Sequence, residues 1–202
     1  MNKVLLIVSG LLIGNLVFAQ NTIRKAFQES YQLELKADFT NAVKILKTVY
    51  VEDSYELNLR LGWLTYEAGK FTESISFYNK AISLMPYGEE AKFGLIYPKA
   101  ALGKWNDIIG IYQEILKISP NNVIANYRLG LIYYERKDYQ KAYPYFKKDV
   151  DLYPFTYDYL LMYAWTSYQL GKMREAKVLF NKVLMISPED TSALEGLGLM
   201  KK

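Results

Sequence analysis

Four of the six prolines recur at a constant interval, and this spacing constrains the fold more than any other feature of the sequence. Each stands 34 residues after the one before: Pro86, Pro120, Pro154 and Pro188. A period of this length is typical of arrays in which every repeat is one supersecondary structure that cannot bury its apolar face alone. It predicts a single repeat domain at 20–202, with repeats at 23–54, 55–88, 89–122, 123–156 and 157–190 and a cap at 191–202.

Within each repeat, the apolar residues follow the spacing of two helices. When the recurrent proline is numbered 32, positions 4, 7, 8 and 11 share one face of a first helix, and positions 17, 20, 24, 27 and 28 share one face of a second. Glycine recurs between them at position 15, as Gly69, Gly103 and Gly171, which predicts a turn. The proline should end the second helix and, as in Ser187-Pro188, open the next helix at its first turn.

One segment of the second repeat carries the whole pattern of small, aromatic and turn residues. It is Leu61-Gly62-Trp63-Leu64-Thr65-Tyr66-Glu67-Ala68-Gly69-Lys70-Phe71, followed by Tyr78, Ala81 and Pro86. This pattern resembles the tetratricopeptide repeat, and the resemblance covers residues 23 to about 198. It implies an all-α fold, a right-handed α-solenoid of about five helical hairpins plus a C-terminal capping helix. It also implies first helices that line a concave groove, and a role in binding other proteins.

Residues 191–202 follow the fifth repeat and carry the start of a sixth. Leu194, Leu197 and Gly198 occupy positions 4, 7 and 8 of that incomplete repeat. Terminal repeats of such arrays need a solvated outer face, so this segment is expected to be the helix that caps the last hairpin.

The third repeat departs most from the pattern. Ile96 and Ile108 stand where small residues are usual, so its two helices should lie further apart. Pro98 falls inside its first helix and should kink that helix without breaking it, because the residue four positions earlier is Gly94. Pro144 should interrupt the second helix of the fourth repeat. These irregularities are either tolerated or a bend that belongs to the fold.

The amino terminus has the three parts of a secretory signal. A short positive segment, Asn2-Lys3, precedes an apolar run from Val4 to Phe18, and Ala19 stands where signal peptidase would cut. Cleavage after Ala19 would place the chain in a periplasm or outside the cell. The alternative is a segment that is kept as a membrane anchor.

Composition excludes much of enzyme chemistry. The chain has no cysteine and no histidine, so disulfides, thiol nucleophiles, Ser-His-Asp triads and the usual zinc sites are excluded. The net charge is +4, too small and too scattered for a nucleic-acid-binding surface. The sequence contains no Gly-rich phosphate loop. We therefore expect a non-enzymatic protein with no catalytic residue, no metal, no cofactor and no nucleic-acid partner.

An aromatic stripe along the first helices is the candidate binding site. The chain has 19 Tyr, 9 Phe and 3 Trp, and large rings fall at positions 5, 9 and 12, on the face opposite the hairpin core. Position 9 is apolar in all the repeats, whereas it is usually polar in the family. Rigid rings with a polar tip are typical of protein interfaces. The candidate residues are Phe27, Tyr31, Trp63, Tyr66, Phe93, Tyr97, Tyr127, Tyr134, Trp165 and Tyr168.

Two interpretations of the stripe remain open: it binds an extended peptide or a partner helix, or it packs between successive first helices. Family members that capture a carboxyl terminus use Lys and Asn at positions 5 and 9. Both positions are apolar in this chain, so that clamp is not expected.

The leading hypothesis for function is a protein-binding scaffold of a cell envelope, with a protein or peptide as partner and membrane contact only if the signal segment is kept. The alternative is a structural subunit of a larger envelope assembly, contacted through its convex face or its ends. An enzyme that acts through carboxylates alone is disfavoured, because the sequence shows no convergent polar cluster.

Overall fold

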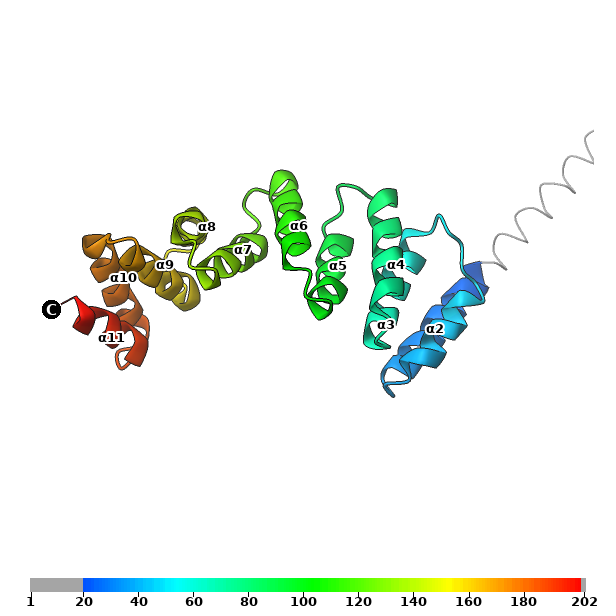
Figure 1. Ribbon diagram of the computed structural model, residues 1–202. Coiled ribbons are helices and arrows are strands. Elements are labelled where there is room, and N and C mark those ends of the chain that lie inside the picture. The colour runs from blue at the N-terminus through cyan, green and yellow to red at the C-terminus, as the bar shows by residue number, and fades with distance from the viewer. Residues whose placement is uncertain (1–19, 201–202) are drawn as a thin grey trace, which may run out of the picture. The chain divides into compact units, whose positions relative to one another are not determined.

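The computed structural model describes residues 20–200, and its regular elements in that range are all helices, which confirms the predicted fold class (Figure 1). The predicted signal segment lies outside the described residues. Between residues 20 and 200, no helix is both long enough and apolar enough to cross a membrane. The first helix covers residues 20–34. It is followed by α2 (Phe39–Lys47), α3 (Tyr55–Glu67), α4 (Phe71–Leu84), α5 (Glu90–Ala101), α6 (Trp105–Ile118), α7 (Val123–Glu135), α8 (Tyr139–Leu152), α9 (Tyr157–Gln169), α10 (Met173–Ile186) and α11 (Thr191–Leu199).

Along the chain, the helices occur in pairs that follow the predicted repeats. In sequence order, the five repeats contain helix 20–34 and α2, α3 and α4, α5 and α6, α7 and α8, and α9 and α10, and α11 then begins a sixth repeat. At position 15 the backbone takes a left-handed turn, with φ of +73° at Gly69 and +72° at Gly171. Lys137 takes the same conformation with φ of +60°, although a side chain makes it less favourable. The predicted turn is confirmed, and it does not require glycine.

The recurrent prolines end helices but do not begin them. α10 ends at Ile186, two residues before Pro188, and α4, α6 and α8 end equally close to their prolines. The prediction that Pro188 opens the next helix is wrong. Asp190 is the N-cap of α11, and its side chain accepts a hydrogen bond of 2.7 Å from the backbone N–H of Ala193. A capping side chain satisfies a backbone N–H that the start of a helix leaves free, which proline cannot do.

Two prolines lie inside helices without ending them. α5 continues through Pro98, so the prediction that this helix would not break is confirmed. The predicted interruption at Pro144 is wrong, because α8 is continuous. Pro144 is exposed, and so is Gln140, whose carbonyl loses its N–H partner to the proline. Water can therefore satisfy that carbonyl.

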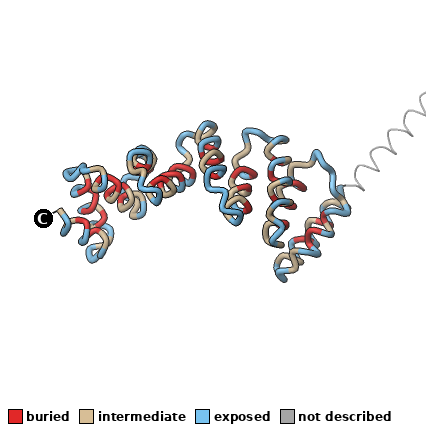
Figure 2. Tube along the Cα trace, in the orientation of Figure 1, coloured by how far each residue is buried: buried red, intermediate tan, exposed pale blue. Residues whose placement is uncertain are grey.

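The chain divides into two compact halves after Trp105. The wider helix spacing predicted from Ile96 and Ile108 concerns residues on the two sides of this division, and it stays a prediction. Buried residues line the facing sides of neighbouring helices in each half (Figure 2). In the N-terminal half they include Ala42, Leu46, Leu57, Leu61 and Leu64. In the C-terminal half they include Leu129, Phe146, Leu160, Phe180 and Val183.

Within both halves, a ring at position 24 lies directly against a glycine of a first helix. A Cβ atom on Gly62 would lie 2.9 Å from the ring of Tyr78, and one on Gly94 would lie 2.3 Å from the same ring. Interiors this closely packed have no room for the extra carbon, so these glycines set the distance between helices. The same contact joins Gly130 to Phe146 and Gly196 to Phe180. The glycine comes from position 8 of the same repeat or from position 6 of the next.

Candidate partner-binding surface

The predicted aromatic residues all lie on first helices of the repeats, and none of them is fully buried. Tyr31 and Tyr97 are the most open, with 50% and 51% of their surface exposed. The others are half-buried, which leaves part of each ring accessible while the rest packs against the protein. The half-buried residues are Phe27, Trp63, Tyr66, Phe93, Tyr127, Tyr134, Trp165 and Tyr168.

In the N-terminal half, three of these rings form one cluster. Trp63 and Tyr66 of α3 and Tyr97 of α5 have ring centroids 5.6 to 6.0 Å apart, each in contact with the other two. Trp63 meets Tyr97 edge to face, at an interplanar angle of 80°. Such pairs are worth about 0.5–1.5 kcal/mol each beyond the area that they bury. These three residues are called the Trp63 cluster below.

A charged pair beneath the Trp63 cluster fixes its position. The indole N–H of Trp63 donates a hydrogen bond of 2.5 Å to Glu34, and Glu34 forms an ion pair of 2.6 Å with Arg60. The guanidinium of Arg60 lies 3.9 Å from the centroid of the Tyr31 ring. A cation over a ring face is attracted by the ring quadrupole. Tyr31, Glu34, Arg60 and the Trp63 cluster therefore form one connected surface on helix 20–34, α3 and α5.

Glu34 remains ionised in this setting. Burial raises the pKa of the Glu34 carboxyl, but hydrogen bonds from Arg60 and Trp63, together with the Arg60 charge, outweigh burial and hold the pKa below its usual range. Sequence reasoning did not identify Glu34. The signal was present, because Glu34 stands at position 12 of the first repeat, where later repeats carry Tyr66, Tyr134 and Tyr168 in the predicted stripe.

In the C-terminal half, the predicted rings fall into three groups. Tyr127 meets Tyr159 at 5.3 Å, and Tyr134 meets Tyr139 at 5.2 Å. The third group, Trp165 with Tyr168 at 5.7 Å, is tied more closely to the core. Trp165 also packs at 5.0 Å on the buried ring of Phe180 and donates an indole hydrogen bond of 2.8 Å to Ser192, just inside α11. Trp165 thus holds α11 in place, and a smaller part of its ring is free for a partner.

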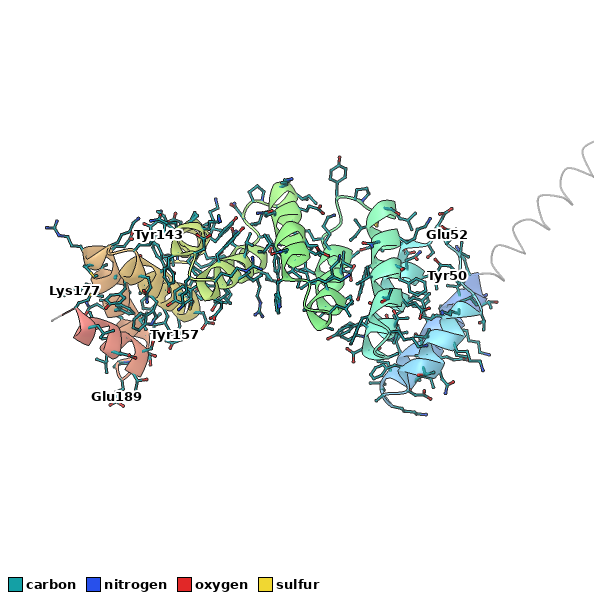
Figure 3. All side chains as sticks on the ribbon, viewed as in Figure 1. Tyr50, Glu52, Tyr143, Tyr157, Lys177 and Glu189 are labelled. Carbon is teal, nitrogen blue, oxygen red and sulfur yellow. The ribbon has the colours of Figure 1, made fainter. Side chains whose placement is uncertain are left out.

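A polar network at Glu175 joins three helices of the same half. Tyr143 of α8 and Tyr163 of α9 donate hydrogen bonds of 3.0 and 2.7 Å to the Glu175 carboxylate, and Ser167 donates a third of 2.9 Å. Tyr143 is labelled in Figure 3. Burial raises the pKa of Glu175, but these hydrogen bonds and the charge of Lys172 outweigh it and lower the pKa. A carboxylate held ionised is a poor proton donor, so the network works as a clamp between helices.

Asp149 of α8 is buried with neither carboxylate oxygen in a hydrogen bond to the described residues. Burial raises the pKa of its carboxyl to about 7. Its position in the repeat is 27, where the other second helices carry the buried residues Ala81, Ile115 and Val183. An isolated carboxylate at an apolar position weakens packing. In the described part of the chain, no three His, Cys, Asp or Glu side chains are placed to hold a metal ion.

Comparison with known proteins gives one family. Models described as "Tetratricopeptide repeat" match residues 55–86, 123–155 and 157–190. A TPR repeat-containing protein of Methanocaldococcus jannaschii is 27% identical over an alignment of 129 residues that covers 56% of this chain and 23% of that protein. A putative sel1-like repeat-containing protein of Acanthamoeba polyphaga mimivirus is 27% identical over 122 residues, 60% of this chain and 22% of its own length. This chain thus spans less than a quarter of either relative.

Solved structures share the fold. A tetratricopeptide repeat protein from Parabacteroides merdae has a TM-score of 0.72 at 23% identity, covering 87% of this chain and 71% of its own. A MamA protein has a TM-score of 0.69 at 21% identity, covering 82% and 92%. YrrB, described as a TPR protein with an unusual peptide-binding site, has a TM-score of 0.65 at 14% identity, covering 88% and 98%.

Proposed function

We propose that this chain, a tetratricopeptide-repeat protein, is a non-catalytic scaffold that binds a peptide or a partner protein on the aromatic face of its first helices. Tetratricopeptide-repeat proteins are generally protein-interaction scaffolds, and YrrB is described as having a peptide-binding site. The single observation that carries the proposal for this chain is the surface made by Tyr31, Glu34, Arg60 and the Trp63 cluster.

This surface is both open and fixed. Tyr31 and Tyr97 are half exposed, while Trp63 and Arg60 are held by their contacts with Glu34. Side chains that are already ordered lose little conformational freedom when a partner binds, so more of the contact energy appears as affinity. Large rings near the centre of an interface carry much of the binding energy in known complexes.

The chemistry of the surface favours a partner that offers apolar side chains. The two charges within it, on Glu34 and Arg60, neutralise each other, and Arg60 is only 9% exposed. The rings offer apolar faces and edges, and the tyrosine hydroxyls offer hydrogen bonds to a backbone. We therefore expect an extended segment or helix that inserts aliphatic or prolyl side chains between Tyr31 and Tyr97.

Substitution of Tyr97 tests the proposal. Random peptides selected on the wild-type protein are measured for binding by fluorescence anisotropy, and Tyr97→Ala should weaken them at least about tenfold, as loss of a central ring does in known interfaces. Tyr87→Ala is the matched control, because Tyr87 is 84% exposed and outside the cluster. Tyr87→Ala should melt like the wild type, and Tyr97→Ala should stay folded but melt at a lower temperature, because it loses two ring pairs. Selection that yields no binding peptides, or peptides equally sensitive to both variants, contradicts the proposal.

We further propose that the scaffold works outside the cytoplasm, in a periplasm or as a secreted protein. The support is the charge and apolar pattern of residues 1–19, with Ala19 at the expected cut. Sequencing the amino terminus of the protein from the cell envelope should give Gln20 as the first residue. A chain that still begins at Met1 in that fraction contradicts cleavage.

A further inference from the structure

α11 occupies the place of a first helix whose second helix is missing from the described chain. Thr191 stands at position 1 of a sixth repeat, and α11 packs on α9 and α10 as α5 packs on α3 and α4. The inner contact is the same in both places. Gly196 lies against the ring of Phe180, as Gly94 lies against the ring of Tyr78, and both glycines are at position 6.

The outer side of α11 lacks the cover that equivalent helices have. At position 8, Gly62 lies under Tyr78 and Gly130 under Phe146, but no described atom comes within 4 Å of a Cβ atom placed on Gly198. At position 4, Leu160 is 0% exposed and Leu194 is 49% exposed. The same residue types at the same positions are thus buried in earlier repeats and open in α11.

A groove of about 480 Å³ lies along this uncovered side. Met173, Arg174, Lys177 and Asn181 of α10 form one wall, and residues of α11 that include Leu194, Leu197 and Gly198 form the other. Lys177, labelled in Figure 3, lies on α10 beside α11. Among residues 20–200, the lining includes two cations and no carboxylate. The groove therefore combines an apolar wall with a positively charged one.

The earlier repeats show which contacts these walls make when they are covered. Lys177 and Asn181 stand at positions 21 and 25 of their repeat. At position 21 of the preceding repeat, Tyr143 donates a hydrogen bond to Glu175, and at position 25 of the first repeat, Lys47 pairs with Glu73. Both acids stand at position 19 of the next repeat, on its second helix. An incoming helix that repeats this geometry would bring an acid to Lys177.

We propose that the groove between α10 and α11 binds a helix of a partner protein, which takes the place of a second helix and completes the sixth hairpin. The helix carries an aromatic residue over Gly198 and an acidic residue five positions earlier, near Lys177 and Arg174. Residues five apart on a helix point about 140° away from each other, which suits a groove with two walls. This surface is separate from the Trp63 cluster.

The chain itself supplies a probe with this chemistry. α4 carries Glu73 and Tyr78 five residues apart, and it packs over a glycine at position 8. A peptide copy of residues 71–84 is labelled with fluorescein and crosslinked between positions 79 and 83, which are exposed in α4. The crosslink is needed because helices this short are marginal in water. Anisotropy then measures its binding to the purified protein.

Two substitutions test the two walls. Gly198→Leu fills the space for the ring, and Lys177→Glu reverses the charge; each should weaken binding roughly tenfold or more. The controls are Gly110→Leu, also a helical glycine with open space at its Cβ, and Lys117→Glu, an exposed lysine of the same helix, α6. A peptide with Glu73→Lys should bind the wild type weakly and recover affinity with the Lys177→Glu protein.

Several outcomes overturn the proposal. The peptide could fail to bind at about 1 mM, where even weak specific contacts are detected. It could bind equally to the Gly198→Leu protein, or show no recovery in the charge exchange. Sedimentation could instead show that the protein pairs with itself through Gly198 and Lys177, in which case the occupant is a second copy. The Tyr97→Ala protein should bind the peptide normally, so this test and that of the aromatic face fail separately.

Discussion

At the scale of single residues, Asp149 is a buried carboxylate with no hydrogen-bond partner among residues 20–200. Its burial raises its pKa from an ordinary 3.8 to about 7, so the folded state holds a proton that the unfolded chain releases at lower pH. Ionisation of Asp149 therefore does not reduce the stability of the protein below about pH 4. The stability falls as the pH rises from about 4 to 7, and it is lowest above pH 7.

Replacement of Asp149 by valine, the residue at the same position in the fifth repeat, should stabilise the protein. We expect a gain of about 2–4 kcal/mol at pH 8 and a smaller gain at pH 5, because one pKa unit corresponds to about 1.4 kcal/mol. Urea denaturation at both pH values measures the effect. Asp151→Asn is the control, because Asp151 is an exposed neighbour paired with Lys147. A gain that is equal at the two pH values would show that the carboxyl titrates normally.

The sequence predicted which positions are turns, core and stripe, because those follow from the period. It did not predict the unpaired state of Asp149 or the support of Trp63 by Glu34. Both depend on the distances between side chains of neighbouring helices. The position of a residue in the repeat does not give those distances.

At the scale of elements, the Glu175 clamp joins α8, α9 and α10 through the hydroxyls of Tyr143, Tyr163 and Ser167. Glu175→Gln should destabilise the protein by about 1–2 kcal/mol at pH 7, the usual range for hydrogen bonds to a charged group that is partly exposed. The lowered pKa of Glu175 means that this stability is present above its unfolded pKa near 4.5 and is lost as pH falls. Thermal melting should therefore show a larger difference between Glu175→Gln and the wild type at pH 7 than at pH 3.

The control for the clamp is Glu189→Gln, an exposed acid in the loop before α11, labelled in Figure 3. It should leave the melting temperature unchanged at both pH values. If it lowers stability as much as Glu175→Gln does, general charge rather than the clamp explains the effect.

The bounds of the helices were largely predictable, since proline and the turn position mark two ends in each repeat. The starts of first helices were not, because the proline only precedes them, and three of them are capped by the side chains of Ser54, Asn122 and Asp190. For Pro144, the sequence predicted an interruption of α8 that the structure does not have. A rule that proline interrupts helices fails where the freed carbonyl is open to water.

At the scale of the whole molecule, the main helix contacts within each half join helices no more than two places apart in the chain. Stability in such an array is approximately a sum over repeats and their neighbours. The period predicted this arrangement but not the division after Trp105, because an equal spacing in sequence carries no signal for where one compact unit ends and the next begins.

Local stability should therefore be separable by hydrogen exchange. Leu61→Ala, at a fully buried site of α3, should remove roughly 2–4 kcal/mol of protection from helix 20–34 to α5 and leave α9 to α11 almost unchanged. Leu160→Ala, at a fully buried site of α9, should give the reverse pattern. Equal loss in all helices from either variant would show one cooperative unit.

The glycines that lie against the rings of Tyr78, Phe146 and Phe180 limit which insertions and deletions this chain can accept. Tyr78 meets one glycine from its own repeat and another from the next, 32 residues apart at Gly62 and Gly94. A duplication or deletion of one whole period keeps a ring together with the position-8 glycine of its own repeat, as Gly62 with Tyr78 and Gly130 with Phe146. An insertion of one residue would instead bring a Cβ atom beneath a ring. Gain or loss of whole hairpins should therefore disturb the helix packing less than an insertion of one residue, which shifts the register of the repeat.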